Sequence, residues 1–154
     1  MIKNAFIGFV SLVTAATLMP GTIVAPAYAV DNMETAGAPD LTSARAKIAA
    51  KNYTGALEEL RGLAEDSPQA DVYNLLGYTL RKTGDFETSL TYYTKALELQ
   101  PDHKAAREYL GELYVETGKM DKANEQVASL TRLCPNGCEE LEDLQKFIAS
   151  NGTK

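Results

Sequence analysis

Hydrophobic residues between Ala70 and Pro101 recur at intervals of three to four positions, in two runs separated by a short turn. The runs consist of Val72, Tyr73, Leu76, Tyr78 and Leu80, and then of Phe86, Leu90, Tyr93, Leu97 and Leu99. This spacing predicts two amphipathic helices. Gly84 suits the cap that ends the first helix, Asp85 suits the N-cap of the second, and Pro101 ends the second. A hairpin this short cannot bury its apolar face alone and therefore needs stacked neighbours.

Small, aromatic, leucine and helix-end residues stand at fixed spacings in this hairpin. They are Tyr73, Leu76, Gly77, Leu80, Gly84, Asp85, Phe86, Ser89, Tyr93, Ala96 and Pro101. This set resembles a tetratricopeptide (TPR) repeat, with Tyr73 in place of the usual Trp, Leu80 in place of Tyr and Ser89 in place of Ala. In such a pattern the small residues Gly77 and Ser89 let two helix axes approach closely, and aromatic side chains fill the gaps beside them.

The pattern recurs on both sides of the central hairpin. Tyr53 precedes Phe86 by 33 residues, and the pair Leu76-Gly77 precedes Leu110-Gly111 by 34. The resemblance implies an all-α, right-handed α-solenoid of about three TPR hairpins and a C-terminal capping helix. The expected domain covers 40–150, with repeats at about 40–69, 70–103 and 104–137 and the cap at 138–150. The cap carries an apolar stripe of Leu141, Leu144, Phe147 and Ile148.

We predict a structural role for each of three residues around the start of the third repeat. Arg107 replaces the large aromatic residue of the repeat pattern, which we expect to loosen that corner of the packing. Asp102 is the expected N-cap of the next helix. His103, the only histidine of the chain, is expected to be a solvated turn residue.

The first 29 residues have the pattern of a signal peptide. Lys3 precedes an apolar run over 5–19, and Ala27-Tyr28-Ala29 is a small-x-small cleavage site. A membrane anchor is the alternative, but the run is short for a bilayer and no charge cluster follows it. We expect an exported protein, periplasmic in a bacterium or secreted, without stable membrane insertion after cleavage. Residues 30–39 are polar and aperiodic, which predicts a flexible leader.

The charge and the catalytic groups of the chain exclude several functions. Its formal net charge is −6, which argues against nucleic acid and anionic lipid as partners. A single histidine leaves no Ser-His-Asp or Cys-His arrangement, and the chain has no phosphate-binding glycine fingerprint. We therefore expect no enzymatic activity, no cofactor and no metal.

Cys134 and Cys138 flank a Pro-Asn-Gly turn between the third hairpin and the cap. Such a turn brings its two ends close, and an exported protein meets oxidising conditions, so a structural disulfide is favoured. The alternative is a thiol-redox or copper-handling protein that uses this pair. Three residues separate the cysteines, instead of the two of thioredoxin-like motifs, and no histidine follows them.

The remaining function is recognition. Resemblance to the family implies a concave groove lined by the first helix of each repeat, binding a protein or peptide partner. The groove residues carried over are Arg45, Asn74, Tyr78, Arg81, Lys82, Glu108, Glu112, Val115 and Glu116. They predict a basic, aromatic side and an acidic side, suited to a segment carrying both charges. The alternatives are ordinary solvated helix surfaces, or a self-assembling scaffold whose groove receives another copy.

Overall fold

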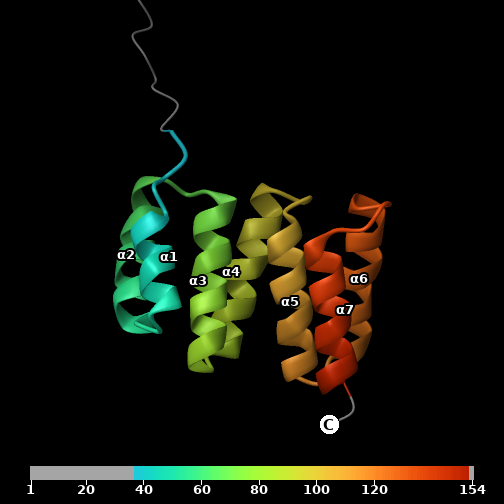
Figure 1. Cartoon of the computed structure of the whole chain (residues 1–154). Helices are drawn as coiled ribbons and strands as arrows, with labels where there is room; N and C mark the ends of the chain where they lie inside the picture. The colour runs from blue at the N-terminus through green and yellow to red at the C-terminus, as the bar shows by residue number, and fades with distance from the viewer. Residues whose placement is uncertain (1–36, 153–154) are drawn as a thin grey trace, which may run out of the picture. The chain divides into compact units, whose positions relative to one another are not determined.

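The computed structural model of the protein describes residues 37–152, and this part of the chain contains seven α-helices and no strand (Figure 1). The helices are α1 (Thr42–Ala49), α2 (Tyr53–Asp66), α3 (Ala70–Thr83), α4 (Phe86–Leu99), α5 (Lys104–Glu116), α6 (Met120–Leu133) and α7 (Glu139–Asn151). The expected all-α helical-repeat solenoid is confirmed. The predicted signal peptide and most of the predicted leader lie outside the described residues. Within 37–152, no helix has the length and apolar character needed to cross a bilayer.

The helices are arranged as stacked hairpins. Each helix packs against the next one along the chain, and α5 packs in addition against α3 and α7. Figure 1 shows α1, α3, α5 and α7 on the side facing the viewer, with α2, α4 and α6 behind them. The first helix of each hairpin therefore contributes to one surface, and α7 extends that surface beyond the third hairpin. We call it the groove face.

The central hairpin closes around the small residues that the sequence singles out. Tyr93 is fully buried, and its ring lies over Gly77, where a side chain would leave no room for it. The Ser89 hydroxyl donates a hydrogen bond of 2.7 Å to the Gly77 carbonyl and so ties α4 to α3. Gly84 adopts a left-handed φ of 86° at the end of α3, and the Asp85 carboxylate accepts from the Thr88 N–H.

Three expectations for the start of the third repeat are wrong. His103, not Asp102, is the N-cap of α5: its Nδ1 accepts a hydrogen bond from the Ala106 N–H. His103 is also buried instead of solvated, and its Nε2 lies 3.0 Å from the Asp71 carboxylate on α3. Arg107 does not leave a loose corner, since its guanidinium donates to the Pro101 carbonyl and to the side chain of Gln126.

Candidate binding surface

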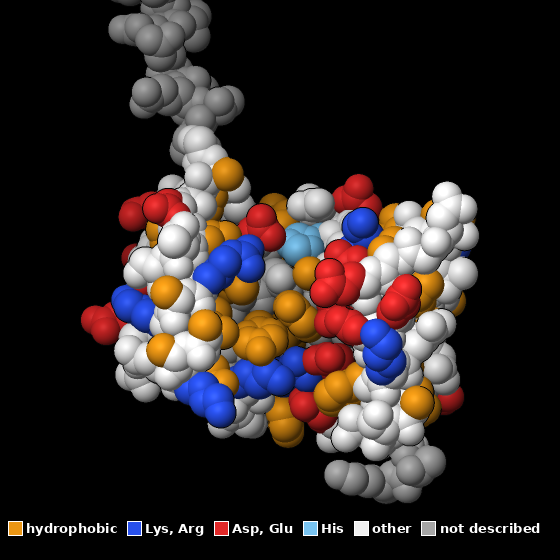
Figure 2. Space-filling model, viewed as in Figure 1, with side chains coloured by type: hydrophobic (Ala, Val, Ile, Leu, Met, Phe, Trp, Pro, Cys, Tyr) orange, Lys and Arg blue, Asp and Glu red, His pale blue; other side chains and the backbone are white. Residues whose placement is uncertain are grey.

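An aromatic hollow lies in the groove face, where α1, α3 and α5 meet. It has a volume of about 320 Å³ and is lined by Arg45, Ile48, Ala49, Leu75, Tyr78 and Tyr109. The rings of Tyr78 and Tyr109 form its floor, with their centroids 5.0 Å apart. Figure 2 shows hydrophobic side chains at the centre of this face, with acidic side chains gathered over α5 and α7 and basic ones over α1 and α3.

The predicted groove residues divide into accessible and buried groups. Arg45, Lys82 and Glu116 are exposed, and Tyr78 is half-buried. The rest are buried to nine-tenths or more: Asn74, Arg81, Glu108, Glu112 and Val115. Because so much of the predicted set is buried, sequence position alone overstates how many of these side chains a partner can touch.

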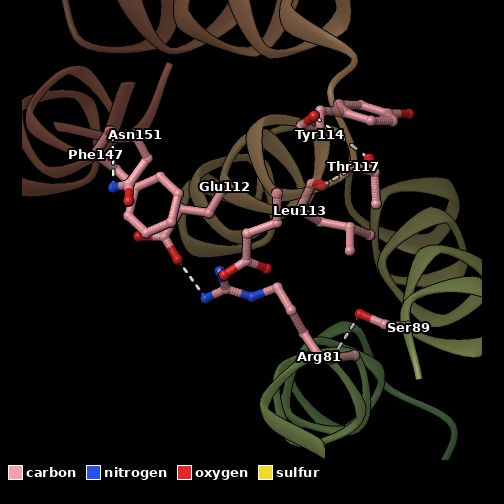
Figure 3. A network of polar contacts seen from close by, with 10 residues as sticks. Arg81, Ser89, Glu112, Leu113, Tyr114, Thr117, Phe147 and Asn151 are labelled. Atoms are coloured by element: carbon pink, nitrogen blue, oxygen red, sulfur yellow. Dashed lines mark hydrogen bonds and ion pairs between the residues drawn. The ribbon is translucent and has the colours of Figure 1, made fainter. Parts of the chain in front are cut away.

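Arg81 has a structural role that the sequence did not reveal. Its side chain is 1% exposed, and the guanidinium forms ion pairs with Glu112 and, at 3.2 Å, with Glu116 on α5 (Figure 3). It also lies 6.0 Å from the centroid of the Phe147 ring on α7. The prediction that Arg81 offers a positive charge to a partner is therefore wrong. Its guanidinium instead contacts α5 and α7 and so links them to α3.

Glu108, unlike Arg81, is a buried charged residue without an ion-pair partner among the described residues. It is 9% exposed, and its carboxyl group forms no hydrogen bond or ion pair within residues 37–152. Burial raises the pKa of Glu108 to about 8, and the negative charges of Glu112, Asp143 and Glu140 add to this effect, while Arg81 opposes it. Near neutral pH this carboxyl group therefore exchanges between its protonated and ionised forms.

One segment of the chain matches a known protein family. Residues 70–103, which form α3, α4 and the turn after them, match the tetratricopeptide repeat family. TPR repeats generally mediate protein–protein interaction and are generally non-catalytic.

Two curated proteins are similar to parts of the chain. Protein CTR9 homolog of Arabidopsis thaliana is 31% identical over 78 residues, which are 51% of this chain and 7% of that protein. The probable biofilm formation methyltransferase WspC of Pseudomonas putida is 34% identical over 89 residues, 54% of this chain and 20% of that protein. The chain thus spans a small fraction of either relative, and their activities do not transfer to it.

Several residues that line the hollow were not among the predicted groove residues. Tyr109, Leu75 and Ile48 line the hollow but do not occupy the positions by which the family's groove residues were carried over. Tyr109 follows Glu108 directly and reaches the hollow from the side of α5, where it meets Tyr78. Its aromatic character next to a predicted groove position was the only signal in the sequence.

The two cysteines lie at the corner between the third hairpin and α7. Their Cα atoms are 5.8 Å apart and their sulfur atoms are at bonding distance, a geometry compatible with the predicted disulfide. A carboxylate oxygen of Glu140 lies within 4.8 Å of both sulfur atoms, so the metal-binding alternative has a third donor available. The disulfide itself stays a prediction.

Thiol titration of the native protein tests that prediction. We expect no reactive thiol before reduction and two after it. We also expect the Cys134→Ala/Cys138→Ala variant to lose about 1–2 kcal/mol of unfolding free energy, because the short loop constrains little chain entropy. Two free thiols in the native protein, or copper(I) bound tightly by it, would instead favour the redox or metal-handling alternative.

Proposed function

We propose that this chain is an exported, non-enzymatic TPR adaptor that binds a protein partner through the groove face. One observation carries the proposal: the aromatic hollow between α1, α3 and α5 is open and apolar, with charged side chains around it. Concave sites with an apolar floor and a few polar groups are typical of binding sites. Export rests on the signal-peptide pattern of residues 1–29 alone.

Blocking the hollow tests this function without disturbing the core. Ala49 is exposed at the end of α1 and lines the hollow, so Ala49→Arg fills the entrance with a long side chain. Proteins recovered by cross-linking from the envelope fraction should fall about tenfold with this variant, a change of about 1.4 kcal/mol in binding. Thermal unfolding should be unchanged, because the site is on the surface.

Ala46→Arg is the matched control. It places the same side chain on the same helix, at an exposed position that does not line the hollow. Partner recovery with Ala46→Arg should equal that of the wild type. If both variants reduce recovery equally, or neither does, the groove face is not the binding surface.

A further inference from the structure

Some charged side chains of the groove face pair with each other, and others do not. Arg81 is buried and paired with Glu112 and Glu116, so its positive charge is not available to a ligand. Glu108 has no such partner within the described residues, although nine-tenths of it is buried. The oxygen atoms of the Glu108 carboxyl group are not enclosed among the described residues, so an opposite charge on a ligand can reach them and would stabilise the ionised form.

Glu108 lies on α5, close enough to charged groups on α3 and α7 for their charges to act on it. It lies one turn from Glu112 on α5, and residues four apart share one side of a helix. Glu112 reaches across to Arg81 on α3, and the charges of Glu140 and Asp143 on α7 act on the Glu108 carboxyl. Figure 2 shows the resulting cluster of acidic side chains over α5 and α7 beside the hydrophobic centre of the face.

The aromatic floor supplies the second element of the site. Tyr109 is the next residue after Glu108, and its ring packs against Tyr78 at the bottom of the hollow. An aromatic ring attracts a cation placed over its face, and a partly buried carboxylate forms strong charge-assisted hydrogen bonds with one. The Arg81 guanidinium already lies 5.9 Å from the centroid of the Tyr109 ring. A guanidinium from a ligand can therefore use only the part of this ring that lines the hollow, while it donates to the Glu108 carboxylate along its edge.

We propose that the groove face binds an arginine side chain of its partner, with the guanidinium between the Glu108 carboxylate and the Tyr109 ring. This inference rests on the proposed function and names the chemistry of the partner: a segment with an arginine next to an apolar residue that enters the hollow. The acidic cluster on α5 and α7 would repel a partner carrying negative charge at this position.

Binding of an arginine by Glu108 would depend on pH in one direction. The groups that face Glu108 are Glu112 on its own helix, Arg81 on α3, and Asp143 and Glu140 on α7. An arginine binds the ionised form of Glu108, and the pKa of this group is about 8. Affinity should therefore rise as pH increases from 6 to about 8 and level off above that, since arginine keeps its charge throughout.

Selection from a library of random twelve-residue peptides tests the inference on the full-length protein. Clones enriched on the wild type and lost on Ala49→Arg should share an arginine at one fixed position. A labelled peptide from this group should bind the wild type about tenfold more tightly than its citrulline counterpart, which has the same shape without the charge. With Glu108→Gln the two peptides should differ by about twofold or less, and the pH dependence should disappear.

Glu98→Gln on α4 is the matched control, because Glu98 is exposed on the opposite layer of helices. It should preserve both the arginine preference and the pH dependence. Clones that are lost on Ala49→Arg but share no arginine would overturn this inference and leave the proposed function standing. Clones indifferent to Ala49→Arg, or no enrichment at all, would count against the groove face as a binding surface.

Discussion

Replacing Arg81 with methionine is expected to lower the free energy of unfolding by about 3–5 kcal/mol, because it leaves buried acidic groups without their cation. Methionine keeps much of the volume but removes the only cation that pairs with Glu112 within the described residues. The Glu112 side chain is 12% exposed. Burial already raises the pKa of Glu112 while Arg81 opposes the shift, so the carboxylate is left buried without compensation. Urea unfolding at pH 7 measures the loss.

Lys82→Met is the matched control for Arg81→Met. Lys82 is the next residue along α3 and is exposed, and no ion pair to it occurs in the described part of the chain. Its substitution should change the unfolding free energy by about 0.5 kcal/mol or less. Adding Glu112→Gln to Arg81→Met should recover part of the loss, because it removes the unpaired charge. Equal stability of Arg81→Met and Lys82→Met would show that the ion pairs contribute nothing.

Because Arg81 stabilises the fold, substitutions at this position cannot test binding. A charge reversal at this position, alone or together with Lys82, would place a new carboxylate beside Glu112 and Glu116. The resulting unfolding would abolish partner binding whether or not the groove face is the binding surface. Substitutions at exposed lining residues such as Ala49 separate the two effects, because they leave the core intact.

The fold was predictable because its signals are local and repeated. The Leu-Gly pair recurs from Leu76-Gly77 to Leu110-Gly111, and turn glycines end α3 at Gly84 and precede α6 at Gly118. Each hairpin places apolar residues at helical spacing, so periodicity and repeat length together define the stacking. The apolar stripe of the cap is buried in the same way, with Leu141 and Leu144 in the core.

The surface was less predictable, because its charges interact across repeats. Sequence position places Arg81 and Glu112 on the same face, but it does not show that two side chains 31 residues apart neutralise each other. The same limit explains His103, whose side chain contacts Asp71, 32 residues earlier in the preceding repeat. Charge on a helical repeat becomes a binding feature only where no neighbouring repeat supplies its partner, as at Glu108.

Gly77→Ala is expected to lower the free energy of unfolding by about 2–3 kcal/mol, although alanine is the better helix former. A Cβ atom at this position would lie 2.6 Å from Cδ1 and 2.7 Å from Cε1 of Tyr93. The ring cannot move aside easily, because Tyr93 is fully buried and packs against the third repeat through Leu110 and Leu113. α3 and α4 must therefore separate, which weakens the centre of the domain. Thermal or urea unfolding measures the change.

Gly62→Ala is the same substitution at a position where no side chain would collide with the added Cβ atom. Gly62 lies inside α2, and a Cβ atom there would have no neighbour within 4 Å. Alanine should raise the unfolding free energy by about 0.5–1 kcal/mol, because it loses less backbone entropy on folding than glycine does. Gly111→Ala should fall between the two. Its Cβ would lie 2.6 Å from Cδ2 and 2.7 Å from Cδ1 of Leu144, which is fully buried like Tyr93, but a leucine side chain can change its rotamer whereas the tyrosine ring is rigid. The order Gly62, Gly111, Gly77 in increasing cost separates packing from helix propensity, because propensity alone predicts the same gain at all three positions.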